Sequence, residues 1–389
     1  MNSYNVADIN GRGLYAAGSA SSTCVTVSNC VFAANGMFTD GGVLGGYGCG
    51  AYFGNLKRVC LDNCLFVTNG AMRVGGYPTG ATGGDNTQGS AVYFSNAPLT
   101  ARNCAFLANQ GTDRSNTYNS GGAIRFAGNC DGSVMTNCVV AGCSDRRGWV
   151  ASSGDGQPGY HGGAITVTMG SSAYTIDLVN VTIAYNLSDG IACPGGINLF
   201  TGTVNLKNSI VFGNFCSHNA LAGNRFGADV DVKEGGVLNA EYTLFTEDST
   251  NSISHAEGAT VNLGQGVIYG DPLFATSFAT VRSRVAYPFG SNYTYFDTTA
   301  ANVGRLAQFN VHLRGGRGYY DEKTGGLVRE YRTQGVVSPA QDAGDRNSSF
   351  AQERDCLDGW HGRRVNLGYY GNTPWATMTA FPGGAFRLR

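Results

Sequence analysis

The sequence predicts an all-β chain wound as a parallel β-helix, and three observations predict it. An eight-residue motif recurs along the chain, a glycine-rich segment recurs between its copies, and apolar residues alternate with other residues over short stretches. Alternation with a period of two predicts strands. Repeated units of this size predict a solenoid, in which each coil stacks on the one before it. We therefore expect three short strands per coil.

The recurring motif begins with asparagine. Its closest copies read "NCVFAANG" (29–36), "NCLFVTNG" (63–70) and "NCAFLANQ" (103–110), and looser copies follow. Asparagine tolerates the left-handed backbone that a corner between strands requires, and its side chain can bond neighbouring backbone groups. We expect the first asparagine of each copy to stack on the others as an asparagine ladder. These residues are Asn29, Asn63, Asn103, Asn137, Asn180 and Asn208.

Cysteine follows the corner asparagine in four consecutive copies, as Cys30, Cys64, Cys104 and Cys138. The aromatic residue two places later, Phe32 in the first copy, has the same parity and is expected to point inward as well. A buried stack of small apolar side chains is the preferred interpretation. Disulfides between coils or a bound metal are the alternatives, but neither histidine nor acidic residues accompany these cysteines.

The glycine-rich segments mark the start of each coil. The distance from each segment to the next corner asparagine stays short, whereas the gap after each asparagine copy varies. Each repeat is therefore a coil of nearly constant length with one loop of variable length. The segments are "GCGAYF" (48–53), "GSAVYF" (89–94), "GGAIRF" (121–126), "GGAITV" (162–167), "GGINLF" (195–200) and "GADVDV" (227–232).

The composition argues against a disordered chain, a nucleic-acid-binding protein and a membrane-spanning protein. Glycine accounts for 59 of 389 residues, about twice its average usage. Hydrophobic residues make up 42% and charged residues 14%, which argues against disorder. The formal net charge of −1 gives no electrostatic reason to expect binding to nucleic acid or anionic membranes. No apolar stretch is long enough to cross a membrane.

The chain begins with the repeat pattern almost at once and carries no secretion signal at its start. We expect Met1 to begin a fragment, with further coils upstream. An uncovered first coil exposes strand edges that pair readily with another chain. The N-terminal edge is thus expected to dock upstream coils or another subunit.

Two resemblances extend from residue 11 to about 376. The alternating "GGAI" and "FxxN" elements resemble the repeats of chlamydial polymorphic membrane proteins and related right-handed β-helix proteins. The C-terminal part is similar to the ends of secreted bacterial β-helix proteins, although "QERDCLDGWHGRR" (352–364) departs from the usual acidic-Pro and Asn-Gly-Gly stretch. Its matching segments are "NSIVFGN" from Asn208, "GDPLF" (270–274), "VHLRGGRG" (311–318), "SPAQDAGD" (338–345) and "RVNLGYYGNTPWA" (364–376). The resemblances imply a right-handed β-helix of a bacterial protein, located outside the cell or at its surface.

Three parts follow from the regularity of the repeats. Residues 1–235 are expected to form the regular coils, and residues 236–312 a less regular continuation. Residues 313–389 are expected to form a closing coil and a C-terminal cap, because a solenoid needs its terminal coils covered.

Loops of variable length leave every coil after the corner motif and should form one face. They span 36–47, 70–88, 110–120, 144–161, 187–194 and 215–226. Aromatic rings suit the flat faces of sugars, and arginine suits hydroxyls or acids, so this face is a candidate glycan-binding surface. Ordinary solvated loops are the alternative. The candidate residues are Tyr77, Arg114, Tyr118, Arg147, Trp149 and Tyr160.

A second candidate surface is the strand that begins at each glycine-rich segment. Its outward positions hold Tyr93, Arg125, Thr166, Asn198 and, with a shift of one residue, Asp229. Stacked about 5 Å apart, such side chains could bind an extended polymer.

The preferred function is a secreted or cell-surface adhesin, passenger or glycan-binding module without catalytic activity. The alternative is a polysaccharide lyase or glycosidase acting along the outward strand face, which needs paired carboxylates or a base. Its weak candidates are Arg125, His161, Asp229 and Asp231, of which the two aspartates share parity. No cofactor or metal is expected, and "DVDVKEG" is only a weak candidate for Ca²⁺.

Overall fold

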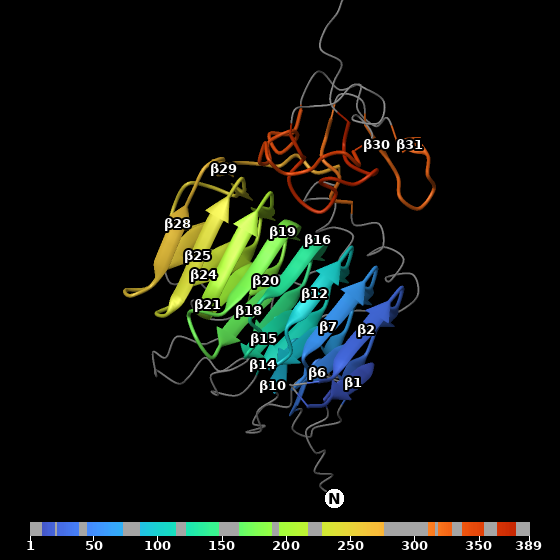
Figure 1. Ribbon diagram of the computed structural model, residues 1–389, viewed down its shortest axis with the longest axis vertical. Coiled ribbons are helices and arrows are strands. Elements are labelled where there is room, and N and C mark those ends of the chain that lie inside the picture. The colour runs from blue at the N-terminus through green and yellow to red at the C-terminus, as the bar shows by residue number, and fades with distance from the viewer. Residues whose placement is uncertain are drawn as a thin grey trace, which may run out of the picture.

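The computed structural model describes residues 10–19, 22–38, 45–72, 86–113, 122–147, 163–188, 194–216, 228–275, 310–315, 318–328, 337–353 and 364–378. All regular structure within these ranges is β, which confirms the predicted class (Figure 1). None of the described residues forms a helix long and apolar enough to cross a membrane.

Each coil contributes strands to three rows. Row 1 starts the coil and comprises β1 (Leu14–Ala17), β6 (Ala51–Gly54), β11 (Val92–Ser95), β15 (Ile124–Gly128), β18 (Ile165–Met169), the first part of β21 (Ile197–Lys207), β24 (Val230–Val232) and β27 (Ile253–His255). Row 2 comprises β2 (Cys24–Ser28), β7 (Arg58–Asp62), β12 (Leu99–Arg102), the first parts of β16 (Ser133–Ala141) and β19 (Thr175–Ala184), the last part of β21, β25 (Gly236–Glu241) and β28 (Thr260–Leu263). Row 3 comprises β3 (Val31–Ala33), β8 (Leu65–Val67), β13 (Ala105–Leu107), the last parts of β16 and β19, β22 (Ile210–Phe212), β26 (Leu244–Phe245) and β29 (Ile268–Tyr269).

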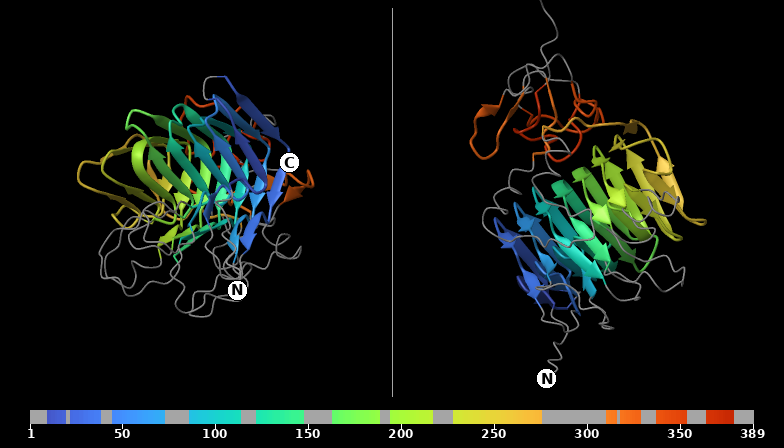
Figure 2. Two further views of the ribbon diagram at one scale, coloured as in Figure 1. Left: turned by 90° about the horizontal axis from the view of Figure 1, so that it is seen from below. Right: turned by 180° about the vertical axis from the view of Figure 1, so that it is seen from behind.

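Every strand in these rows pairs in parallel with its counterpart in the next coil. Phe32, for example, pairs with Phe66, which pairs with Phe106, so equivalent positions of the repeat lie directly above one another. The coils follow one another along a single axis, and the sheet curls around it (Figures 1 and 2). This arrangement is a parallel β-solenoid.

The corner asparagines have the backbone conformation that the sequence predicts. All six have φ between 50° and 53°, in the left-handed region that asparagine tolerates better than most residues. Their side chains, however, make only one bond from one corner to the next among the described residues. Asn63 Nδ2 donates to Asn29 Oδ1 over 2.7 Å. The corner positions are thus confirmed, whereas the side chains of the last three corners, Asn137, Asn180 and Asn208, bond to the C-terminal segment instead.

The core contains the predicted stacks of cysteine and phenylalanine. Cys64, Cys104 and Cys138 are buried in the core cluster, and all ten cysteines within the described ranges are free thiols. The rings of Phe66 and Phe106 stack with centroids 5.0 Å apart. The apolar interpretation of the cysteine positions is therefore confirmed for the described residues.

A second asparagine ladder, at the last asparagine of the motif, lies inside the solenoid. Asn69 Nδ2 donates to Asn109 Oδ1 over 2.9 Å, and Asn35 donates in the same way to Asn69. Further along the axis, Asn186 Nδ2 donates to Asn214 Oδ1 over 2.9 Å. Buried amides need such partners, so this inner ladder holds successive coils together where the loops leave them.

Short strands at the base of the loops form a separate sheet. Those leaving the coils are β4 (Gly36–Phe38), β9 (Gly70–Met72), β14 (Gln110–Asp113), β17 (Ser144–Arg147), β20 (Leu187–Ser188) and β23 (Phe215–Cys216), and those returning are β5 (Gly45–Tyr47) and β10 (Asn86–Gln88). Their mutual pairing confirms that the loops leave the solenoid on one side. The loops beyond these strands lie outside the described residues.

The C-terminal segment lies along the flank of the solenoid. It contains the antiparallel pair β30 (Tyr319–Tyr320) and β31 (Leu327–Val328), and it is drawn in orange and red beside the coils (Figure 1). Asn137 Nδ2 donates to the backbone oxygens of Tyr369 (2.9 Å) and Gly371 (2.7 Å), and Asn180 also donates to Gly371.

The described C-terminal residues thus bind the corners of the fourth to sixth coils, and a cap across the last coil stays a prediction. Asn208, the sixth corner, donates to Ser348 and accepts from the backbone of Asp345. Apolar side chains on the outer side of row 3, such as Val139 and Ile210, form one buried cluster with Leu313 and Leu367. The boundaries at residues 235 and 312 stay a prediction.

Candidate functional site

The outward row predicted on the row 1 strands is confirmed as a stack. Tyr93 pairs with Arg125, Arg125 with Thr166, and Thr166 with Asn198. The next member is Asp231, which pairs with Asn198. The prediction of Asp229 at this position is therefore wrong, because Asp231 is the fifth residue of its segment, as Arg125 and Thr166 are of theirs.

The members of this row are packed against other side chains. Tyr93 is 9% exposed and Arg125 is 4% exposed. The Arg125 guanidinium lies 5.8 Å from the centre of the Tyr93 ring and donates to Thr168 Oγ1 over 3.2 Å. Burial lowers the pKa of Arg125. Asn198 is fully buried, and a ligand-binding role for these three residues stays a prediction.

Asp229 ends the inner asparagine ladder. It accepts from Asn214 Nδ2 (2.9 Å), from Ser252 Oγ (2.5 Å) and from the backbone N–H of Thr246 (3.0 Å). Burial raises its pKa, and the hydrogen bonds oppose that shift. Asp229 thus points into the structure, contrary to the outward position that its parity suggested.

Asp231 is held by different partners. Its carboxylate forms an ion pair with Lys233 and accepts from Ser254 Oγ over 2.8 Å. Because Asp229 bonds to the inner ladder and Asp231 to row 1 neighbours, the two carboxylates do not share a solvent-facing site.

The remaining predicted residues lie largely outside the described part of the chain. Tyr77, Arg114, Tyr118, Trp149, Tyr160 and His161 fall there entirely. Arg147 ends β17, but its side chain is not described. Among the described residues, no group of three histidine, cysteine or acidic side chains could hold a metal ion. Calcium binding at "DVDVKEG" stays a prediction.

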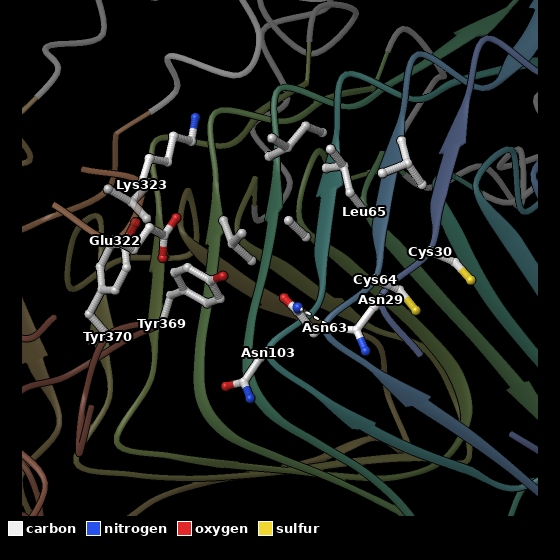
Figure 3. A pocket seen from close by; sticks show the side chains of 15 residues that line it. Asn29, Cys30, Asn63, Cys64, Leu65, Asn103, Glu322, Lys323, Tyr369 and Tyr370 are labelled. Carbon is white, nitrogen blue, oxygen red and sulfur yellow. Dashed lines mark hydrogen bonds between the residues drawn. The ribbon is translucent and has the colours of Figure 1, made fainter. Parts of the chain in front are cut away.

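A groove runs between the corners of the first three coils and the C-terminal segment (Figure 3). It consists of two adjoining cavities of about 340 and 480 Å³. Both cavities are lined by Asn63, Asn103, Glu322, Tyr369 and Tyr370. The C-terminal segment is hydrogen-bonded to the corner asparagines from Asn137 onward. The groove lies beside the three corners before Asn137, to which the segment forms no such bond within the described residues.

One wall of the groove consists of corner amides and the apolar outer side of row 3. Asn29, Asn63 and Asn103 follow one another along it, with Leu65 beside them (Figure 3). The Asn103 side chain is exposed and forms no hydrogen bond to the described residues. This wall therefore offers a free amide next to an apolar strip.

The opposite wall carries aromatic rings on a fixed backbone. Tyr369 donates its backbone N–H to Thr182 Oγ1 (3.0 Å) and its carbonyl accepts from Asn137, so two coils hold it in place. Trp375 lines the second cavity, and its backbone N–H donates to Thr373 Oγ1 over 3.3 Å. Burial raises the pKa of Tyr369 and of Tyr370, so both hydroxyls stay protonated at neutral pH.

Glu322 supplies a carboxylate to this wall from the turn between β30 and β31. Asp321 fixes the turn by accepting from the backbone N–H groups of Lys323 (3.0 Å) and Thr324 (2.8 Å). The Glu322 side chain is exposed along the groove, yet the surrounding walls desolvate its carboxyl and raise its pKa. Lys323 and a hydrogen bond from Tyr370 oppose this shift.

A buried histidine supports the aromatic wall from behind. The His312 ring lies between Tyr319 and Tyr370, with centroids 3.8 and 3.6 Å away. His312 is 2% exposed, and burial lowers its pKa to about 3, so it is neutral at physiological pH. Its Nδ1 lies 2.8 Å from Asn310 Oδ1, and Asn310 in turn donates to the Tyr319 hydroxyl.

Sequence reasoning did not identify this groove. Glu322, Tyr369 and Trp375 lie in the segment expected to be a cap, and the corner asparagines were assigned a structural role only. The available signal was "GYYGNTPW" (368–375), an aromatic cluster in a segment poor in strands.

No family model, curated protein or solved structure matches this chain. The resemblance to chlamydial polymorphic membrane proteins accordingly rests on the repeated motifs alone.

Proposed function

We propose that this chain is a glycan-binding β-helix protein, right-handed and displayed outside the cell, and that the groove beside the corner asparagines holds the saccharide. The proposal keeps the adhesin or passenger class and moves the binding site from the loop face to the C-terminal flank. The resemblance to bacterial surface proteins supports the location and the handedness.

The observation that carries the proposal is the combination of side chains in the groove. Saccharides have apolar ring faces and many hydroxyls, so they bind where aromatic rings lie next to fixed amides and carboxylates. Tyr370 and Trp375 supply the rings, Asn103 supplies a free amide, and Glu322 supplies an acceptor. The groove also extends along three stacked corners, which suits a chain of sugars.

Replacing Trp375 or Asn103 by alanine is expected to weaken saccharide binding about tenfold or more, which corresponds to about 1.4 kcal/mol. The tryptophan contributes stacking area, and the amide contributes hydrogen bonds to hydroxyls. A panel of neutral, amine-bearing and acidic oligosaccharides would first identify binders by glycan array. Isothermal titration calorimetry would then measure the dissociation constants.

Asn262→Ala is the matched control. Asn262 is an exposed asparagine on row 2 that donates to Asn239 Oδ1 over 2.8 Å, and it does not line the groove. Its removal should leave the affinity unchanged. The proposal fails if no saccharide binds, or if Asn262→Ala weakens binding as much as Asn103→Ala.

A further inference from the structure

Glu322 is the charged group that faces the interior of the groove. In Figure 3 its carboxylate points across the groove toward the corner asparagines, whereas the Lys323 ammonium points away from them. Within the described part of the chain, Glu322 forms no salt bridge. A partly desolvated carboxylate therefore faces the space where a ligand would lie.

Such a carboxylate is costly to cover with another negative charge. A ligand carboxylate or sulfate placed against it would bring two like charges together, which is unfavourable. An ammonium group would instead form a charge-assisted hydrogen bond there, and such bonds are stronger than neutral ones. The neighbouring amides of Asn63 and Asn103 can serve the hydroxyls of the same sugar.

We propose that the groove selects saccharides bearing a free amine, such as glucosamine oligomers, with Glu322 as the residue that determines this specificity. This inference rests on the proposed function and assigns the ligand class of the same groove. Tyr370 lines the groove beside Glu322 and is itself held by stacking on His312. Tyr369 and Trp375 serve any saccharide, whatever its charge.

The test compares three oligosaccharides of equal length at pH 7 by calorimetry: a glucosamine oligomer, its N-acetylated form and a galacturonate oligomer. The glucosamine oligomer is expected to bind at least tenfold more tightly than the N-acetylated form, and the galacturonate oligomer most weakly. Glu322→Gln keeps the size and polarity of the side chain but removes its charge. This variant should lower the affinity for the glucosamine oligomer to that for the N-acetylated form, so that the preference for the amine is lost.

The outcomes separate this inference from the proposed function. Equal binding of the first two oligomers, or a preference for galacturonate, overturns the inference while leaving a glycan-binding groove. Loss of preference in a Lys323→Gln variant but not in Glu322→Gln would also overturn it. If none of the three oligomers nor any other saccharide binds, the proposed function itself fails.

Discussion

Replacing Asn109 by alanine is expected to destabilise the protein by about 3 to 5 kcal/mol, because each buried polar group left without a partner costs about 1 to 3 kcal/mol. Asn109 is fully buried, and its Oδ1 accepts from both the backbone N–H (3.0 Å) and the Nδ2 (2.9 Å) of Asn69. Its Nδ2 donates to the carbonyl of Phe66 over 2.9 Å. Alanine removes these three bonds and a fourth, weaker one to Cys143 Sγ, and the packed core does not easily admit water in their place.

Guanidinium denaturation followed by tryptophan fluorescence and far-ultraviolet circular dichroism would measure the change. Asn262→Ala removes an exposed ladder bond of the same type and should shift the free energy of unfolding by less than about 0.5 kcal/mol. Similar losses in the two variants would show that the inner ladder adds nothing to stability.

Acidification from pH 7.5 to pH 5 is expected to cost the folded protein about 2 kcal/mol through His312 alone. Its pKa is about 3 in the folded protein and 6.5 by reference, because burial between two tyrosines disfavours the charged ring. Below pH 6.5 the unfolded chain binds a proton that the folded chain does not. The penalty is therefore nearly absent above pH 6.5 and grows progressively as the pH falls from 6.5 toward 3.

Denaturation curves at both pH values would test this for the native sequence and for His312→Phe, which keeps a flat ring between Tyr319 and Tyr370. The variant should lose most of the difference between the two pH values. Asp321 and a backbone hydrogen bond with Trp375 favour protonation of His312, but burial outweighs them. The substitution changes neither of these two residues. His255→Gln changes an exposed histidine and serves as the control. The assignment is wrong if His312→Phe keeps the full pH dependence.

The repeat positions could be predicted because they depend on local rules. A corner needs a left-handed residue, and the core needs inward apolar side chains at fixed parity, so Asn63 and Cys64 can be assigned from a single motif. The register at Asp229 was harder to predict, because Asn198 is the fourth residue of "GGINLF" whereas its partner Asp231 is the fifth residue of "GADVDV". The Asp231 pairing with Asn198 decides it.

The groove could not be predicted from the repeats at all. Asn137 contacts Tyr369 across 232 residues, and no periodicity links the C-terminal segment to particular coils. The segment lies on the flank because Leu313 and Leu367 pack in one cluster with apolar residues on the outer side of row 3, such as Val139. In the sequence, these outward apolar residues cannot be distinguished from those of the core. The site thus depends on long-range packing rather than on a motif.

The C-terminal segment also divides the solenoid into parts that should open at different rates. Its hydrogen bonds tie down the corners Asn137, Asn180 and Asn208, whereas Asn29, Asn63 and Asn103 have no such tie within the described residues. In a solenoid each coil contacts mainly its neighbours, so opening can begin at an end and proceed coil by coil. Amide hydrogen exchange should therefore be fastest in β1 to β3 and much slower from β16 onward. The coils that face the groove are then the ones that open locally most often.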